Sequence, residues 1–94
     1  MIDPKRDPLA WSMLMYELED AHEHLGNLIR EMDACADEVE FRIQLAHVHA
    51  HLNRAWNLRG KDDAWHDAFV RHDPVQDAEY EAARAFPTNL EPIA

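Results

Sequence analysis

Apolar residues return every three or four positions between residues 8 and 33, which is the spacing of one face of an α-helix. The stripe consists of Trp11, Met15, Leu18, Leu25, Ile29 and Met32, with His22 at its centre. Asp7 and Pro8 suit a helix start, because the carboxylate can cap free N–H groups and proline fits the first turn. We therefore predict an amphipathic helix over residues 8–33 and expect its stripe, His22 included, to be buried.

A second helix is predicted over residues 37–59, where apolar positions follow two stripes. The main stripe consists of Phe41, Leu45, Val48, Leu52, Ala55 and Trp56, and the opposite one of Val39, Ile43, Ala46 and Ala50. Asp37 and Glu40 resemble a capping box, and Gly60 is suited to end the helix. One stripe should pack on the first helix, while the small residues of the other suit a close approach by a further element.

The apolar stripe changes phase between residues 33 and 37, and this change favours a turn that folds the two helices into an antiparallel hairpin. The alternative is one unbroken helix over residues 8–59, about 78 Å long, which would need an oligomer to cover it. We expect the hairpin, because a chain of 94 residues is too small to cover such a rod alone.

The last third of the chain predicts two short helices and a tail. Aspartates stand at the start of a helix predicted over residues 62–72 and of another over residues 74–86, and each can cap its helix. Residues 87–94 contain two prolines and should form an extended tail, which Leu90 and Ile93 can tether to the core.

These elements predict an all-α fold class for a single domain over residues 1–94: an antiparallel helical hairpin plus two short C-terminal helices. Two short helices give too little cover for a helix that is apolar on both sides. We therefore predict a homodimer in which two hairpins form a four-helix bundle. In the alternative, the protein is a monomer whose C-terminal helices close the second face.

Charge is unevenly distributed along the chain, whose formal net charge is −10. Residues 1–33 and residues 61–94 each hold eight acidic and three basic residues, whereas residues 34–60 are neutral. We expect the neutral segment to be the buried centre. The acidity argues against nucleic acid as a partner, and no apolar run is long enough to cross a membrane. A lone Cys35 and the lack of a signal sequence predict a cytoplasmic location.

Histidines suggest a metal site between the two long helices. If the turn centres near residue 35, antiparallel pairing brings His22 close to His47 and His51, which stand one helical turn apart. Imidazoles four residues apart project alike and can share an ion. The metal-binding alternative is therefore a site for zinc, or for another divalent transition metal, formed by His22, His47 and His51 with Glu19 as a possible fourth ligand, whereas a purely structural polar cluster is the interpretation that we favour.

Two other interpretations of the histidines stay open. In the first, a neutral, buried His22 hydrogen-bonds to Gln44 or His47 and the cluster is purely structural. In the second, the cluster is a pH-responsive switch, because protonating a buried histidine costs stability. His24 and His49 lie nearer the charged faces of their helices, and we expect both to be solvated.

No catalytic set is apparent: the only serine, Ser12, has no nucleophile elbow, and no glycine-rich phosphate loop exists. We therefore expect a non-enzymatic, homodimeric protein-interaction or accessory module without a cofactor, with the metal-binding bundle as the alternative. A polar and aromatic patch on the second helix is of the type found in protein interfaces. The patch consists of Asn53, Arg54, Trp56 and Asn57. Alternatively, the tryptophans simply fill the end of the bundle.

Overall fold

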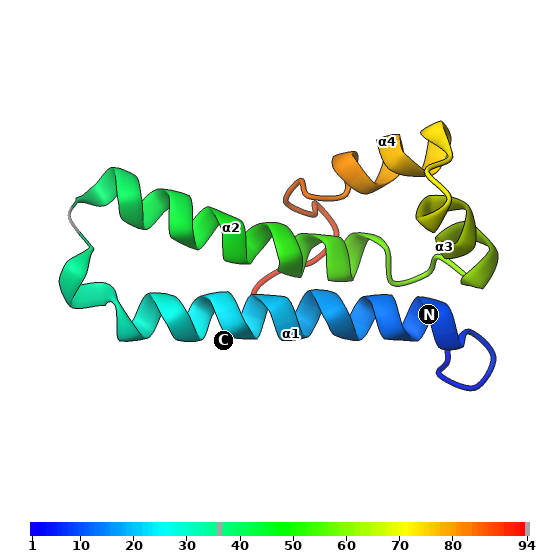
Figure 1. Cartoon of the computed structure of the whole chain (residues 1–94), viewed down its shortest axis with the longest axis horizontal. Helices are drawn as coiled ribbons and strands as arrows, with labels where there is room; N and C mark the ends of the chain where they lie inside the picture. Colours follow the sequence, from blue (N-terminus) through cyan, green and yellow to red (C-terminus); the bar gives the residue numbers. More distant parts are fainter. Residues whose placement is uncertain (36, 94) are drawn as a thin grey trace.

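A computed structural model describes residues 1–35 and 37–93, and the elements within these ranges are all helical (Figure 1). Four α-helices and a 3₁₀ turn follow in the order α1 (Pro8–Arg30), η1 (Met32–Ala34), α2 (Glu38–Asn57), α3 (Asp63–Val70) and α4 (Pro74–Ala82). The prediction of an all-α fold is thereby confirmed for the described residues. No helix among them combines the length and the apolar character needed to cross a lipid bilayer.

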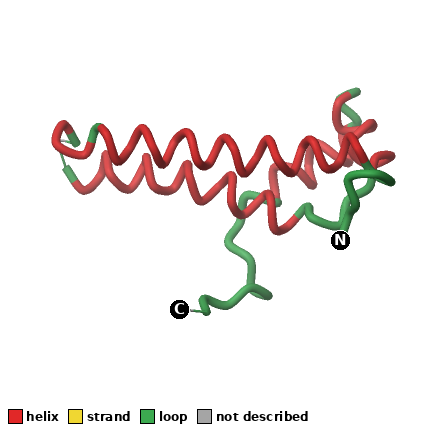
Figure 2. The backbone as a smooth tube through the Cα atoms, turned by 90° about the horizontal axis from the view of Figure 1, so that it is seen from below, coloured by secondary structure: helices red, strands yellow, loops and turns green. Residues whose placement is uncertain are grey.

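The two long helices run antiparallel and side by side along their length (Figures 1 and 2). Helix α1 ends at Arg30, because η1 tightens the chain before the turn. Helix α2 starts after Asp37, whose side chain accepts a hydrogen bond of 2.9 Å from the backbone N–H of Glu40. The chain therefore forms the predicted hairpin and not the unbroken rod. Each of the four α-helices ends two to four residues before its predicted end.

Helix α1 is capped from a distant part of the chain. Asp7 makes no capping hydrogen bond, because its carboxylate pairs with Arg6 at 3.1 Å. Instead the backbone N–H of Ala10 donates to Asp63 Oδ1 at 2.7 Å, which joins the first turn of α1 to the first turn of α3. The expected Asp7 cap is therefore wrong, and the replacement fixes α3 at the open end of the hairpin.

The buried side of α1 is not the predicted apolar stripe. The buried residues Ala10, Glu17, Ala21 and Leu28 follow a helical spacing and turn towards α2. The predicted stripe is largely exposed, with Leu18 at 41% and Ile29 at 66% of full exposure. The expectation of a buried stripe is thus wrong, because alanines let α2 approach closely and the buried Glu17 finds a partner on α2.

Burial along α2 is confined to its second half. Val48, His51, Asn53 and Ala55 are buried, whereas the start of the helix is exposed. The neutral segment 34–60 is therefore the buried centre only in part. Two further expectations fail in the tail: Leu90 is 49% and Ile93 98% exposed, so neither tethers it to the core.

Candidate metal centre

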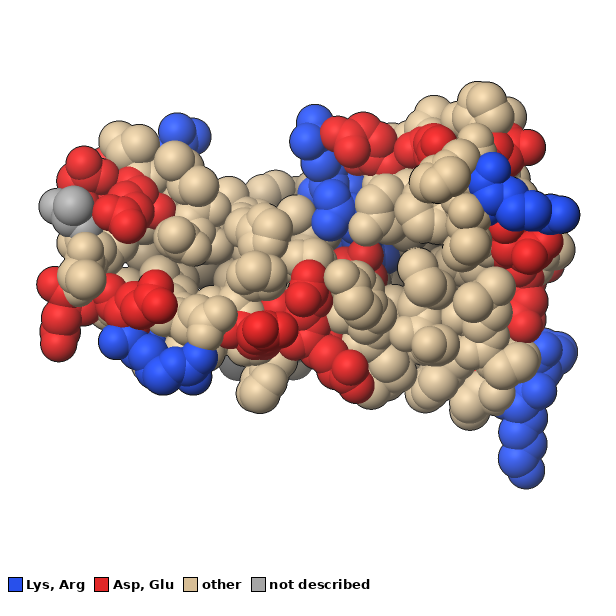
Figure 3. Space-filling model, viewed as in Figure 1, with Lys and Arg blue, Asp and Glu red and all other residues tan. Residues whose placement is uncertain are grey.

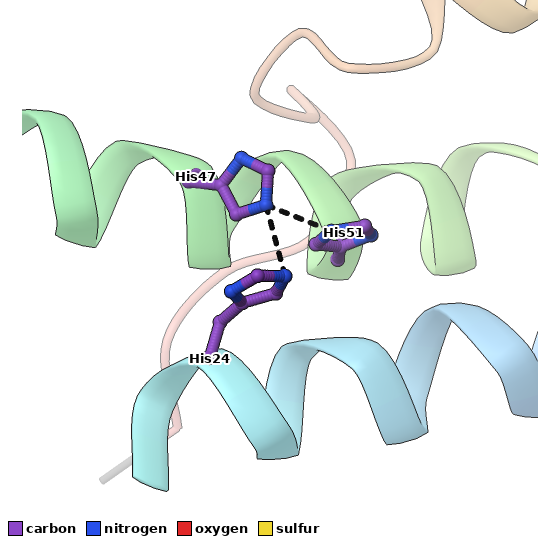
Figure 4. A group of neighbouring side chains, drawn as sticks. All are labelled: His24, His47 and His51. Atoms are coloured by element: carbon purple, nitrogen blue, oxygen red, sulfur yellow. Dashed lines mark hydrogen bonds between the residues drawn. The ribbon is translucent and has the colours of Figure 1, made fainter. Parts of the chain in front are cut away.

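Three imidazole rings converge between α1 and α2 (Figure 4). His24 comes from α1, while His47 and His51 lie one turn apart on α2. His47 Nε2 lies 3.2 Å from His24 Nε2 and 3.3 Å from His51 Nε2. One ring nitrogen of each residue lies within 4.8 Å of those of the other two. We call His24, His47 and His51 the histidine cluster.

A carboxylate borders the cluster on the α1 side. Asp20 stands one turn before His24, and its Oδ2 lies 2.9 Å from His51 Nε2 and 3.8 Å from His24 Nε2. Asp20 and His24 on α1 therefore mirror the spacing of His47 and His51 on α2, so that each helix contributes two ligand atoms four residues apart.

A second carboxylate lies behind His51. Glu17 Oε2 lies 2.7 Å from His51 Nδ1, and both side chains are buried. The other oxygen of Glu17 accepts a 3.0 Å hydrogen bond from the hydroxyl of Tyr80 on α4. Burial, and then the Glu17 charge, raise the pKa of Tyr80 to about 12, so the phenol stays a neutral donor to the carboxylate.

Both ring nitrogens of His51 face carboxylate oxygens. A neutral imidazole carries one N–H, so it can donate to Glu17 or to Asp20 but not to both. With its N–H directed to Glu17, the ring presents the lone pair of Nε2 to His47 and Asp20, which is the orientation that a metal ligand needs. Solvent exclusion, followed by the nearby His24 and His51, lowers the pKa of His47 and favours its neutral, metal-binding form.

The burial of the cluster is graded. His51 is buried between the helices, His24 is half-buried, and His47 is exposed. The side chain of Asp20 is 22% exposed. The exposed side of the cluster is thus open to an ion from solvent, while the His51 ring, which contacts Glu17, is held in the core.

The structure places the predicted ligands in two groups. His47 and His51 come together as expected, but His22 and Glu19 are exposed and lie outside the histidine cluster. The expected burial of His22 is wrong, and His24, which was expected to be solvated, is half-buried and belongs to the histidine cluster. Two residues along a helix rotate the side chain by about 200°, so His24 faces α2 where His22 does not.

The sequence did contain a signal for the missed residues. Asp20 and His24 repeat the four-residue spacing of His47 and His51, and the hairpin places the two pairs opposite each other. Burial of Glu17 could not have been inferred from its residue type, because glutamate is seldom buried without a partner.

The polar and aromatic patch predicted as an interaction surface contacts the C-terminal part of the same chain. Asn53 donates to the carbonyl of Arg84 at 2.9 Å, and Asn57 to that of Ala83 at 2.8 Å. Trp56 Nε1 donates to Asn89 Oδ1 at 2.9 Å. The guanidinium of Arg54 lies 4.7 Å from the centre of the Tyr80 ring.

No protein-family model, curated protein or solved structure matches the chain. The class of protein is therefore defined by geometry alone: an all-helical hairpin with a cluster of three histidines and two carboxylates between its long helices.

Proposed function

We propose that this protein binds one divalent transition-metal ion, with zinc the best fit, through His24, His47, His51 and Asp20. The observation that carries the proposal is the convergence of three Nε2 atoms and one carboxylate oxygen from two facing helices. Two nitrogen ligands bonded to a tetrahedral zinc ion lie about 3.3 Å apart. The measured separations of 3.2 and 3.3 Å match that value closely.

Glu17 supports the proposal from behind the ligands. Metal-binding histidines commonly donate their other N–H to a carboxylate, which fixes the ring and raises its basicity. His51 has this arrangement, since its Nδ1 lies 2.7 Å from Glu17 while its Nε2 faces the other ligands. Glu17 is itself held by Tyr80, so the support extends from α1 to α4.

The number of ligands favours a structural role for the ion. Three histidines and one aspartate fill all four positions of a tetrahedral ion, whereas catalytic zinc sites keep one position for water or substrate. We therefore propose a non-enzymatic protein in which the ion ties α1 to α2.

Metal content can be measured on tag-free protein that has been stripped with a chelator and titrated with Zn²⁺ in a calorimeter. We expect about one equivalent to bind per chain, and His47→Ala to abolish this binding. His22→Ala is the matched control, because His22 is exposed on the same protein and lies outside the cluster. Circular dichroism shows whether each variant remains helical.

Two results would contradict the proposal. One is a wild-type protein that stays helical yet binds no stoichiometric Zn²⁺, Co²⁺ or Ni²⁺. The other is an equal loss of binding in His22→Ala and His47→Ala, which would place the site outside the cluster. Visible absorption of Co²⁺-loaded protein adds a geometric test, because tetrahedral and octahedral Co²⁺ differ in spectrum.

We further propose that the protein acts as a homodimeric accessory module, in which two hairpins form a four-helix bundle. The supporting observation is separate from the metal centre: apolar side chains along α1, such as Leu18 and Ile29, remain exposed in the single chain. Light scattering coupled to size-exclusion chromatography tests this proposal, and a mass of 11.0 kDa at all concentrations would reject it.

A further inference from the structure

One face of the hairpin is largely apolar, with the exposed His22 among its apolar side chains, and we call it the apolar face. Its apolar residues are Met15, Leu18, Leu25 and Ile29 of α1, Met32 of η1, and Leu45 and Leu52 of α2. All of these side chains are exposed except Leu45, which is half-buried. No Asp, Glu, Lys or Arg stands at any of these positions, although the chain carries 28 charged residues in total, 19 acidic and 9 basic.

The histidine cluster shows that the two helices contribute to the same face. At about 100° per residue, the exposed stripe of α1 lies to one side of the buried residues and Asp20 to the other. On α2, Leu45 and Leu52 lie likewise on the side away from His47. We call the side of the hairpin that carries Asp20 and His47 the metal side. Because both residues lie there, both apolar stripes lie on the opposite side of the hairpin.

The short helices do not cover the apolar face. Phe69 of α3 and Tyr80 of α4 enclose a small space together with Met13, Glu17 and Arg54, which lie on the metal side. Helices α3 and α4 therefore close the metal side at the open end of the hairpin. The apolar face has no helical cover from its own chain within the described residues.

The C-terminal tail leaves the hairpin next to the apolar face. Phe86, just before the tail, packs its ring on His49, and Asn89 of the tail accepts a hydrogen bond from Trp56; His49 and Trp56 continue the row of Leu45 and Leu52 along α2. The tail then projects away from the hairpin (Figure 2). The exposed apolar side chains here are Leu90 and Ile93 of the tail and Phe86 just before it. A partner seated on the apolar face would thus also meet the tail.

The size of the face suits a stable protein partner. Residues 15–30 of α1 extend over about 23 Å, Met32 of η1 lies just beyond them, and two helices side by side are about 18–20 Å wide. The face thus offers about 500 Å² per chain, or about 1,000 Å² in a symmetric pair before the tails are added. This area reaches the lower limit for a specific interface.

The internal core gives a second reason for association. Four of the eight buried apolar residues among the described positions are alanines, namely Ala10, Ala21, Ala55 and Ala83. Alanine buries little apolar area, so a domain of this size gains little stability from its own core. Pairing two apolar faces supplies the second layer that a two-helix layer lacks.

We infer that the apolar face binds the same face of a second copy, so that α1 and α2 of both chains form the four-helix bundle and the two metal sides point outwards. This inference rests on the homodimer of the proposed function but not on the metal. A second copy is favoured because the apolar positions of the face carry no Asp, Glu, Lys or Arg. Two identical faces can therefore meet in a symmetric, isologous interface without contacts between like charges.

Two isoleucines of similar exposure provide the test. Ile29 lies on the apolar face and is 66% exposed, while Ile43 lies on the outer side of α2 and is 59% exposed. We expect the wild-type mass to be about twice that of one chain. Ile29→Arg should raise the dimer dissociation constant by at least about thirtyfold, because it places an unpaired charge within the apolar interface. Ile43→Arg should leave the constant unchanged.

Sedimentation equilibrium on full-length protein, with and without chelator, distinguishes the outcomes. A wild-type monomer at all concentrations would reject the homodimer itself. A dimer that Ile43→Arg dissociates while Ile29→Arg does not would keep the homodimer but place its interface on the outer side of α2. A dimer that neither variant weakens would likewise overturn the assignment to the apolar face. Because both isoleucines are exposed, each variant is expected to remain helical.

Discussion

Glu17 and His51 form a buried hydrogen-bonded pair, with a distance of 2.7 Å and side-chain exposures of 6% and 8%. Removing one member of a buried pair leaves the other without compensation, which commonly costs several kcal/mol. In our proposal the pair has two roles: it fixes α2 against α1, and it orients the His51 ring towards the metal.

Glu17→Gln tests whether Glu17 orients the His51 ring. An amide holds the N–H of His51 less strongly than a carboxylate does, so we expect zinc affinity to fall by about 10- to 100-fold. Titration calorimetry at one pH measures the effect. Glu19→Gln is the matched control, because Glu19 is exposed and outside the cluster. Equal affinities of the two variants would show that Glu17 does not orient the ligand.

His66 predicts a pH dependence of stability. Its side chain is 95% buried and its Nδ1 has no hydrogen-bond partner in the protein. Burial lowers the pKa of His66 below the ordinary value of 6.5, although Asp63 and Asp62 act in the opposite direction. The unfolded chain then binds a proton more readily than the folded one, so stability is greatest above about pH 6.5 and falls as the pH drops below it.

Urea unfolding between about pH 7.5 and pH 5 measures this loss, with a chelator present so that metal binding does not contribute. His66→Leu should flatten the decline, since its side chain does not titrate. The prediction fails if the variant and the wild type lose stability in parallel, because the decline would then arise elsewhere, for example at His47.

Helix α3 ends in a turn that its sequence does not suit. His72 follows the helix with φ of 61°, the left-handed conformation that favours glycine. The backbone N–H of His72 donates to the carbonyl of Phe69, and that of Asp73 donates to Ala68, which is the pattern of a Schellman C-cap. The conformation is therefore imposed by the cap and the start of α4.

His72→Gly should stabilise the protein by about 1 kcal/mol, because glycine adopts this conformation without a Cβ penalty. Thermal unfolding followed by circular dichroism measures the gain. His72→Ala keeps the penalty and should give no gain. If both variants changed stability equally, the side chain of His72, and not its backbone, would be responsible.

At the level of elements, the sequence predicted the helices and their pairing but not the face on which they meet. The predicted register was nearly correct, since Asp20 and His24 lie opposite His51 and His47. The error came from the rule that the most apolar stripe packs inside the chain. In α1 a stripe with alanines and a buried ion pair packs inside, and the most apolar stripe stays outside.

The candidate site shows the same limit. His47 and His51 could be predicted from their spacing, because i and i+4 positions share a face in any helix. Asp20 and His24 show the same spacing, but spacing does not say which side of α1 meets α2, and the burial of Glu17 depends on that side alone. A rotation of about 100° about the helix axis exchanges the two stripes, and local sequence gives little information on that rotation.

For the whole molecule, charge opposes association. Acidic side chains are prominent over the middle of α1 and over α4 on the side seen in Figure 3. Each chain has a net charge of −10, so two copies repel each other at long range. An apolar interface without ion pairs must overcome that repulsion.

Dimerisation should therefore strengthen as salt is added. The Debye length, beyond which exposed charges are largely screened from each other, is about 10 Å at 0.1 M ionic strength. A series from about 0.02 to 0.5 M therefore covers the range in which the repulsion between the chains disappears. Sedimentation equilibrium at each ionic strength gives the dissociation constant. A dissociation constant that rises with salt would indicate an interface made of ion pairs and would argue against the apolar face.

The order of the metal ligands along the chain has a further consequence. Asp20 and His24 precede the turn, whereas His47 and His51 follow it. The four side chains come together only when the hairpin is formed, so an ion bound by all four would stabilise the folded chain and leave the unfolded chain unconstrained. The ion would act as a reversible cross-link of the folded state: its removal would lower the unfolding temperature without breaking a single apolar contact.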